Sequence, residues 1–335
     1  MHARSPLFLA LLLLPLALVA SAMATEPAAN SAPPTARLEA RADAAAPQTR
    51  VAAPAVTPAE VKDKYLRLQR DERGRPTAME VAIVRYQSEK KPAAVVDLIG
   101  AVHVADPDFF ARLNREFGNY DAVLYELVAA EGTRPVQGQK VKSGNPVSTL
   151  QTGLTRVLDL QFQLDGIDYR ADNMVHADMS PEEFAQSMRD RGESVASIFF
   201  RMMAYSMMQQ SGDSGRSAEM EILMALLNKD RSLALKRAMA KQFEDLGGVM
   251  LAIDGPEGST LISQRNKKAL EVLDRELKAG KQKLAIFYGA GHMPDMAKRL
   301  EADFGMKPTG TRWITAWNMA DSAEKAKPEK AKPAE

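Results

Sequence analysis

Apolar residues form two runs of the kind that fill buried strands, and both runs end in the same motif. The first run, Val95–Val102, ends in Gly-x-x-His at His103, and the second, Leu284–Gly291, ends in the same way at His292. Nearly continuous apolar runs are typical of central strands that are buried on both faces. We therefore expect two buried strands, each followed directly by a histidine.

A helix-like pattern follows each of these motifs. Two twelve-residue stretches begin at Pro107 and Pro294, and six of their twelve positions are identical. Asp106 followed by Pro107 is a typical helix start, with Asp as the N-cap. A second buried strand, Ala122–Leu127, comes next and is interrupted by Glu126. Strand, helix and strand in this order predict a βαβ unit with parallel strands.

The flanking pattern completes the predicted domain. Alternating residues in Lys64–Arg70 and Ala78–Tyr86 favour a β-hairpin, with a helix over Pro58–Arg70 as the alternative. A helix from Pro294 and a strand over Thr311–Trp317 follow the second motif. We predict an α/β fold with a mixed central sheet built from two strand-helix-strand halves, which brings both motif histidines to one edge.

The region between the two halves, from about residue 147 to residue 278, has a largely helical pattern. Ser180-Pro181-Glu182-Glu183 is typical of a helix start with a capping box, and Thr260–Leu277 predicts a further amphipathic helix. Met and Leu recur at helical spacing in Phe199–Met208 and Met220–Leu227. Such a stripe can bind a hydrophobic ligand or partner, but core packing is more common and is what we expect here.

The two ends of the chain have compositions that differ from the middle. Residues 1–24 have a basic start, an apolar run and small residues, as in a secretory signal peptide. Residues 25–57 are rich in Ala and Pro and predict a disordered linker, and residues 320–335 predict a disordered tail of Lys, Pro and Glu. The folded unit is expected over residues 58–319.

Composition narrows the setting and the chemistry. The 335 residues carry a formal net charge of +1, so electrostatics gives no reason to expect nucleic acid as a partner. The chain has no cysteine, which excludes disulfides and thiolate metal ligands. The signal-like segment predicts a periplasmic or secreted protein of a Gram-negative bacterium, with no membrane span after cleavage. The sequence makes no prediction of the oligomeric state.

Side chains suited to metal binding gather at the predicted strand ends. Gly100, Gly289 and Gly291 permit backbone conformations that other residues resist, and are expected to turn the chain and direct each histidine across the sheet. Glu126 is a lone carboxylate at a strand end, where burial is costly without a partner or a metal. Ligand sites form at this edge of α/β sheets, and two imidazoles with one carboxylate suit a divalent metal that activates water.

In order, Gly100-Ala101-Val102-His103, Tyr125-Glu126-Leu127, Gln264-Arg265-Asn266 and Tyr288-Gly289-Ala290-Gly291-His292 resemble the motifs of the TraB/PrgY/TIKI (GumN-like) family. The resemblance covers residues 95–127 and 260–317. It implies a fold similar to the haem-binding ChaN group and the erythromycin esterases. Animal members of the family are described as metal-dependent proteases that use manganese or cobalt, whereas many bacterial members have no assigned reaction.

Transferred onto this chain, the resemblance makes His103 and His292 metal ligands or direct catalytic groups. It makes Glu126 either the third ligand or the general base, and the ligand role is preferred. Arg265 is expected to hold a substrate carboxylate or a developing oxyanion. Further residues could support the site or bind substrate: Tyr288, Asn266 and His176.

These expectations together describe a periplasmic metal-dependent hydrolase, a peptidase that uses a water activated by Mn, Co or Zn on a peptide or small-molecule substrate. Two alternatives share the same residues. The cleft could hold haem, a peptide or another small ligand without turnover, or the enzyme could be an esterase.

Overall fold

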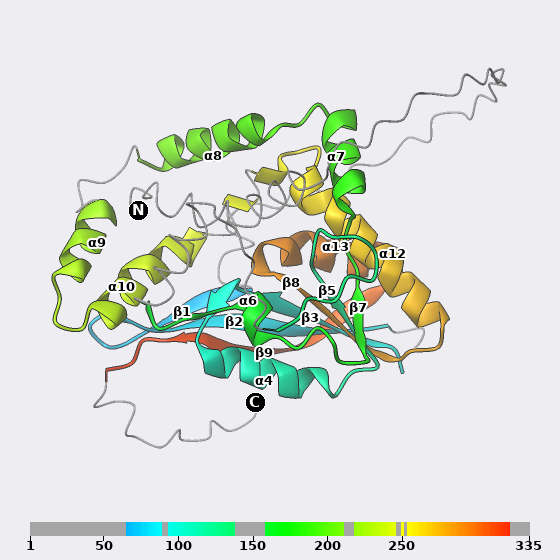
Figure 1. Cartoon of the computed structure of the whole chain (residues 1–335), viewed down its shortest axis with the longest axis horizontal. Coiled ribbons are helices and arrows are strands. Elements are labelled where there is room, and N and C mark those ends of the chain that lie inside the picture. The colour runs from blue at the N-terminus through cyan, green and yellow to red at the C-terminus, as the bar shows by residue number, and fades with distance from the viewer. Residues whose placement is uncertain are drawn as a thin grey trace.

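The computed structural model of the chain describes residues 65–88, 93–137, 158–210, 218–245, 249–250 and 253–321. The predicted signal peptide and linker, residues 1–57, lie outside these ranges, as does the tail beyond residue 321. A mixed sheet forms the centre of the described part, with helices on both of its faces (Figure 1). This confirms the predicted α/β fold with a mixed central sheet.

One side of the sheet is antiparallel. Strand β1 (Leu66–Arg70) and strand β2 (Pro76–Ser88) form the predicted hairpin. The alternative of a helix that ends at Arg70 is therefore wrong for the residues of β1. The long strand β2 also pairs with β3 (Val95–Ala101) and with β9 (Met306–Asn318), both antiparallel. The last strand of the second half therefore returns to the hairpin, and does not form a parallel unit with its own half.

The other side of the sheet is parallel and contains both motif strands. Strand β8 (Lys283–Gly289) lies directly beside β3 and pairs with it along its full length. Strand β5 (Ala122–Tyr125) pairs with the other edge of β8, and β7 (Met174–His176) pairs with β5. The order β3-β8-β5-β7 places β8 between the two strands of the first predicted unit.

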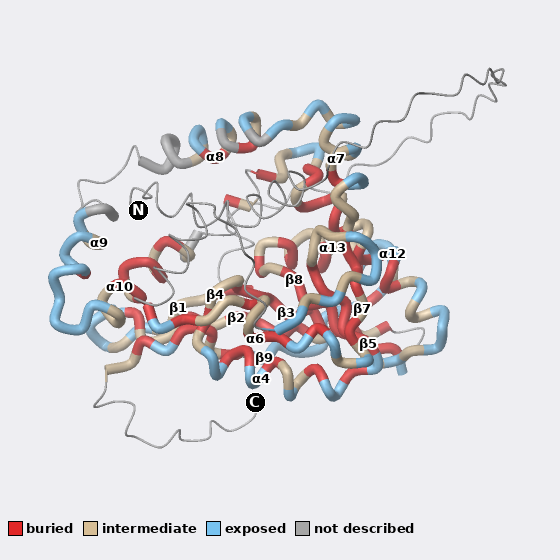
Figure 2. Tube along the Cα trace, in the orientation of Figure 1, coloured by how far each residue is buried: buried red, intermediate tan, exposed pale blue. Residues whose placement is uncertain are grey.

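Strand residues alternate between two cores, which explains the near-continuous apolar runs. In β8, Ala285 and Phe287 pack on one face, and Leu284, Ile286 and Tyr288 pack on the other. Because every second side chain points to the same face, a strand that is buried on both faces has no polar positions to reveal its period. Figure 2 shows these central strands as the most deeply buried part of the chain.

Helices cover both faces of the sheet. Helix α4 (Pro107–Phe117) packs into one core together with α10 (Arg231–Ala240). Helix α12 (Arg265–Lys278) and helix α13 (Met293–Phe304) pack into the core on the opposite face. Asp106 is the N-cap of α4 but makes no capping bond, since its carboxylate binds Lys236 at 2.6 Å.

The described part of the insert is mostly helical, as predicted. It contains α6 (Gln163–Gly166), α7 (Pro181–Asp190), α8 (Val195–Gln210) and α9 (Ala218–Leu226), and the 3₁₀ turn η1 (Lys241–Asp245) follows α10. Ser180 and Glu183 form the expected capping box at α7. Short strands β4 (Val104–Ala105) and β6 (Gln161–Phe162) pair separately from the main sheet.

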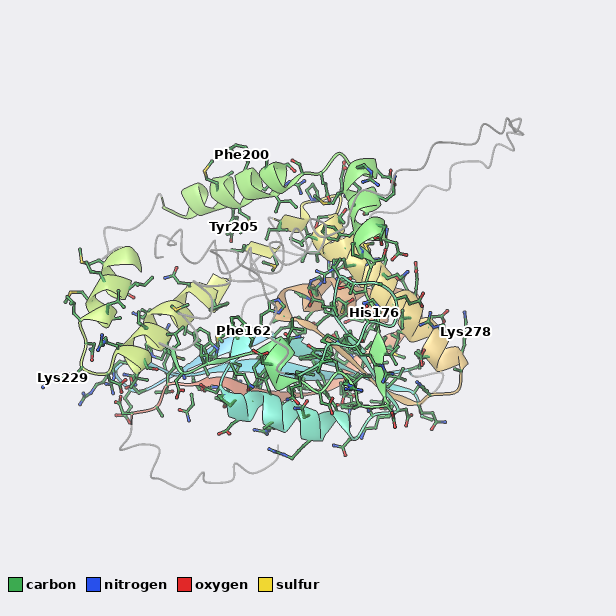
Figure 3. The ribbon with its side chains drawn as sticks, viewed as in Figure 1. Phe162, His176, Phe200, Tyr205, Lys229 and Lys278 are labelled. Carbon is green, nitrogen blue, oxygen red and sulfur yellow. The ribbon has the colours of Figure 1, made fainter. Side chains whose placement is uncertain are left out.

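The Met- and Leu-rich stripes are less buried than predicted. Met202 of α8 is buried, but Phe200 of the same helix is 60% exposed and projects outward (Figure 3). In and just after α9, four apolar residues at helical spacing are all exposed: Met220, Leu223, Met224 and Leu227. The expectation of core packing is therefore wrong for these positions, because α9 turns its other face to α10.

Among the residues that the structure describes, no helix has both the length and the apolar character needed to cross a bilayer.

Candidate functional site

Four chemically active side chains follow the ends of four consecutive parallel strands. His103 follows β3, and His292 lies in the 3₁₀ turn η3 (Ala290–His292) that follows β8. Glu126 comes directly after β5, and Asp178 lies two residues beyond β7. Because carboxyl ends of neighbouring parallel strands meet at one edge, the fold brings the two predicted histidines and Glu126 to the same edge of the sheet.

The motif glycines provide space at this edge. None of Gly100, Gly289 and Gly291 is among the glycines with positive φ, so the expected special backbone conformation is wrong. A Cβ on Gly291 would lie 2.5 Å from the Met250 side chain, and one on Gly289 would lie 3.3 Å from Glu126 Oε2. These two glycines are thus small because other side chains approach them closely.

Glu126 is held on both of its carboxylate oxygens. Its Oε1 accepts a hydrogen bond from Arg265 Nη2 at 2.7 Å, and its Oε2 accepts one from the backbone N–H of Gly289 at 2.7 Å. Arg265 also donates from Nε and Nη2 to the two oxygens of Asp178, at 3.0 and 2.5 Å. One guanidinium therefore joins two carboxylates, and all three side chains are buried.

The charge of Glu126 depends on these neighbours. Burial by itself raises the pKa of a carboxyl group. Arg265 has the strongest opposing effect, and the imidazoles of His292 and His103 add to it. The result is that the pKa of Glu126 lies well below its usual range, so this buried group is a carboxylate at neutral pH.

His292 is a neutral, buried imidazole. Burial lowers its pKa to about 4, and the attraction of Glu126 only partly opposes this effect. Its Nδ1 lies 2.7 Å from Asn266 Oδ1, and its ring meets the ring of Tyr288 edge-on at 5.2 Å. Its Nε2 lies 3.6 Å from Glu126 Oε1, which is too long for a hydrogen bond.

His103 is held by Gln163, at the start of α6. Its Nδ1 lies 3.2 Å from Oε1 of Gln163, and its carbonyl accepts the backbone N–H of Gln163 at 2.9 Å. His103 is partly exposed, in contrast to His292. It lies close enough to Glu126 to contribute to the low pKa of that carboxyl group.

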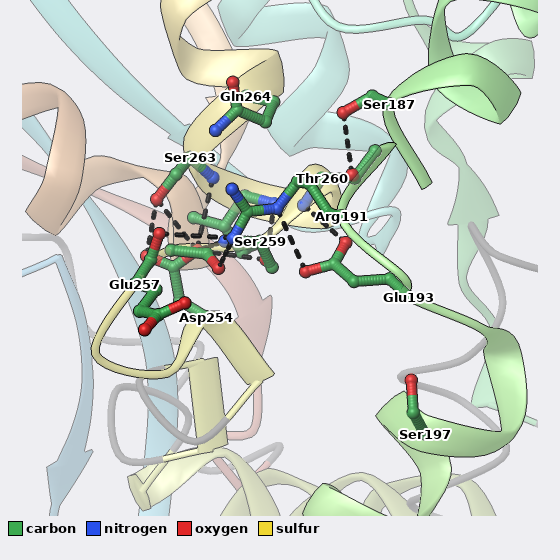
Figure 4. A network of polar contacts seen from close by, with 12 residues as sticks. Ser187, Arg191, Glu193, Ser197, Asp254, Glu257, Ser259, Thr260, Ser263 and Gln264 are labelled. Atoms are coloured by element: carbon green, nitrogen blue, oxygen red, sulfur yellow. Dashed lines mark hydrogen bonds and ion pairs between the residues drawn. The ribbon is translucent and has the colours of Figure 1, made fainter. Parts of the chain in front are cut away.

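Arg265 and Asn266 begin helix α12 directly after a π-helical turn, Thr260–Gln264. Figure 4 shows the polar network that holds this turn. Asp254 Oδ1 accepts from the N–H of Ser259 at 2.8 Å and from the hydroxyl of Ser263 at 2.9 Å. The sequence predicted one continuous helix here. Single π turns occur often at functional sites, and this one leads directly into the two site residues.

Glu193, between α7 and α8, holds the same turn from another side. Its Oε2 accepts the N–H of Thr260 at 2.9 Å, and its Oε1 accepts from Arg191 Nε at 3.3 Å. Arg191 also donates to the carbonyls of Glu257 and Gly258, which lie just before the π-helical turn. The start of α12 is thus fixed by contacts that lie outside the site.

Tyr288 and His176 occupy supporting positions. The hydroxyl of Tyr288 donates to the carbonyl of Ala177 at 2.5 Å, so it ties β8 to the chain after β7. His176 lies on β7 (Figure 3) and its Nε2 binds the carbonyl of Leu127 at 2.6 Å. Its ring packs against Tyr125. The Nε2 of His176 therefore carries a proton and donates a hydrogen bond.

Asp178 and Gln163 are the site residues that sequence reasoning missed. Asp178 lies two residues before Ser180, which is the N-cap of α7. Gln163 lies in an insert with no recognisable motif. Arg265 is buried and requires carboxylate partners, but β7 has three residues, so the sequence gives no local signal that Asp178 follows a strand.

Within the described ranges, no group of three or more His, Asp or Glu side chains has the spacing of a complete metal site. The comparisons with known proteins leave the family open, since no family model, no curated protein and no solved structure matches the chain.

Proposed function

We propose that this protein is a metal-dependent hydrolase that acts on peptides, with its site at the carboxyl ends of β3, β8 and β5. The observation that carries the proposal is the pair formed by His292 and Glu126. A neutral imidazole nitrogen and an ionised carboxylate oxygen lie 3.6 Å apart in a buried setting, with no hydrogen bond between them.

These two atoms fit a common divalent ion. Nitrogen and oxygen ligands lie about 2.0–2.2 Å from zinc, and a tetrahedral angle at that ion separates two such ligands by roughly 3.4 Å. The 3.6 Å between His292 Nε2 and Glu126 Oε1 is close to this value. His103, which follows the neighbouring strand β3, is the third donor of the proposed set.

Arg265 acts through Glu126 in this proposal. Its guanidinium is saturated by two carboxylates and almost fully buried, so it is poorly placed to receive a substrate carboxylate. It keeps Glu126 ionised and fixes the direction of Oε1. We therefore assign Glu126 as a ligand and Arg265 as the residue that positions it.

A divalent ion held by these residues would supply a water of lowered pKa and would polarise the carbonyl of the scissile bond. The chain contributes ligands with fixed orientation and a site edge that largely excludes bulk water. The choice of peptides over other substrates rests on the two Gly-x-x-His motifs and their resemblance to the TraB/PrgY/TIKI family. The signal-like N-terminus supports a periplasmic site of action.

The test is metal binding by the purified mature protein, measured by elemental analysis and by titration with Mn²⁺, Co²⁺ and Zn²⁺. We expect binding in the wild type and a loss of affinity of at least about tenfold in His292→Ala and Glu126→Gln. His176→Ala is the matched control, because His176 is another buried histidine that faces a backbone carbonyl. Absence of a bound divalent ion in the wild type would contradict the proposal.

Activity is tested next on a peptide mixture, with products identified by mass spectrometry. Metal-dependent cleavage that disappears in Glu126→Gln supports the peptidase, and unchanged cleavage in that variant refutes it. Cleavage of esters but not of peptides would favour the esterase. A strong absorption band on adding haemin, lost in His292→Ala, would instead favour a haem-binding protein.

A further inference from the structure

Each motif histidine is bonded through Nδ1 to the oxygen of a side-chain carboxamide. His292 meets Asn266 at 2.7 Å, and His103 meets Gln163 at 3.2 Å. The two amides come from unrelated elements, the start of α12 and the start of α6. The same arrangement therefore occurs twice, once for each half of the sheet.

The orientation of the Asn266 amide is fixed by its nitrogen. Asn266 Nδ2 donates to the carbonyl of His292 at 3.1 Å and to Asp295 Oδ2 at 2.8 Å. Both partners only accept hydrogen bonds, since one is a carbonyl and the other a carboxylate. The –NH₂ group must therefore face away from the imidazole, which leaves Asn266 Oδ1 toward His292 Nδ1. A carbonyl oxygen cannot donate, so Nδ1 of His292 carries the proton.

Gln163 has a similar arrangement of contacts. Its Nε2 donates to the hydroxyl of Tyr169 at 2.9 Å, and its backbone N–H donates to the carbonyl of His103 at 2.9 Å. A hydroxyl can donate as well as accept, so the orientation of this amide follows from its placement in the structure, with Oε1 toward Nδ1 of His103. In that orientation Nδ1 of His103 is the donor. When the ring of His103 is neutral, its proton lies on Nδ1 and the lone pair on Nε2.

We propose that Asn266 and Gln163 are positioning residues that hold both motif histidines as Nδ1–H tautomers, so that each Nε2 presents a lone pair to the site. Metal-bound histidines commonly have such a partner on the second nitrogen, which fixes the tautomer and the ring. The role in metal binding rests on the proposed function, whereas the tautomers themselves are a property of the metal-free protein. Asn266 is thus placed behind the histidine and not against substrate.

The first test is the tautomeric state of the histidines in ¹⁵N-labelled, metal-free protein, read from long-range ¹H–¹⁵N NMR correlations at pH 7.5. We expect Nδ1–H for His103 and His292. His176 provides an internal control with the other tautomer. Its Nε2 donates to the carbonyl of Leu127, so its neutral ring is expected to carry the proton on Nε2. An Nε2–H form of His292 in the wild type would overturn the proposal.

The second test removes each amide. Asn266→Leu and Gln163→Leu are expected to give mixed tautomers at the neighbouring histidine and to weaken Mn²⁺ binding about 10–100-fold. Gln163→Glu is the conservative variant: it keeps the acceptor, and the Tyr169 hydroxyl can rotate to donate to it, so the Nδ1–H tautomer of His103 should persist. Asn173→Leu is the matched control, since the Asn173 amide donates to the backbone carbonyls of Phe117 and Tyr120, at and just after the end of α4.

The outcomes separate the two proposals. Unchanged tautomers in both leucine variants would overturn the positioning role, whether or not the protein binds metal. Expected tautomers in a wild-type protein that binds no Mn²⁺, Co²⁺ or Zn²⁺ would overturn the metal site alone. Circular dichroism of each variant identifies a loss of fold, and a variant that fails to fold is replaced by the smaller change Asn266→Ser or Gln163→Met.

Discussion

Replacing Arg265 by methionine should destabilise the protein severely, because it leaves two buried carboxylates without their cation. Glu126 is 8% exposed, Asp178 is 3% exposed, and Arg265 itself is 4% exposed. The arginine makes three charge-assisted hydrogen bonds, of 2.5 to 3.0 Å, to these two groups. Breaking a buried ion pair by removing one partner costs about 3–5 kcal/mol, and we expect a loss in that range at pH 7.5.

The loss of stability in Arg265→Met should depend on pH. In the wild type the pKa of Glu126 is lowered, so its contribution to stability is present above its usual pKa and is lost as the pH falls through the folded value. Without Arg265, burial raises that pKa, and the variant gains stability relative to the unfolded chain as Glu126 becomes protonated. The gap in unfolding free energy between wild type and variant should therefore narrow as the pH falls from 7.5 toward 5.

Urea unfolding at 25 °C, followed by far-UV circular dichroism, measures this gap. Lys268→Met is the matched control on the same helix: Lys268 forms a partly exposed pair with Glu183, for which we expect a loss below about 1 kcal/mol. Adding Glu126→Gln to Arg265→Met should recover part of the loss. A loss in Arg265→Met no larger than in the control, or a gap that does not change with pH, would refute the reasoning.

Two further predictions concern the packing of the fold. Gly166→Ala would place a Cβ 2.5 Å from the ring of Phe110 and should lower the free energy of unfolding by about 1–3 kcal/mol, measured by thermal unfolding. Gly310→Ala is the control and should be neutral, because no atom lies within 4 Å of its new Cβ. Equal losses of stability in the two variants would contradict this prediction. Asp97 is fully buried. Burial alone raises the pKa of a carboxyl group, but the hydrogen bonds that Asp97 accepts from Arg85 and Tyr120 lower its pKa overall. The contribution of Asp97 to stability is therefore present above about pH 4 and is lost as the pH falls further. Asp97→Asn should therefore lose stability at pH 7 and show a weaker decline between pH 4 and pH 2, and urea midpoints that fall in parallel with the wild type would argue against it.

The repeat was sufficient to predict two equivalent strands that bring both histidines to one edge of a sheet. It did not predict that β3 and β8 lie side by side, with β8 between the two strands of the first predicted unit. Glu126 could be placed because a carboxylate at the end of an apolar strand is costly without a function. These inferences depend on local patterns of nine or ten residues, which a single sequence displays directly.

The remaining site residues depend on contacts that no local pattern records. Strand β7 has three residues, too few to show a period, so the position of Asp178 beside Arg265 could not be predicted. The carboxamide partner of His103 comes from position 163, about sixty residues further along the chain. Helical spacing in Met220–Leu227 identified a helix but not the side on which it packs. The glycines were correctly linked to the site, but the reason is the space they leave for Met250 and Glu126.

The central position of β8 has a consequence for how the chain is made. This strand lies between β3 and β5, yet it follows its partner in β3 by about 190 residues and is therefore synthesised well after both of its neighbours. Pairing over such a separation is slow, because the intervening chain must first be ordered. Until β8 arrives, the facing edges of β3 and β5 are open to pairing with other molecules, which is a route to aggregation. Nascent chains that end before Lys283 should therefore depend on protection by chaperones more than the full-length protein does.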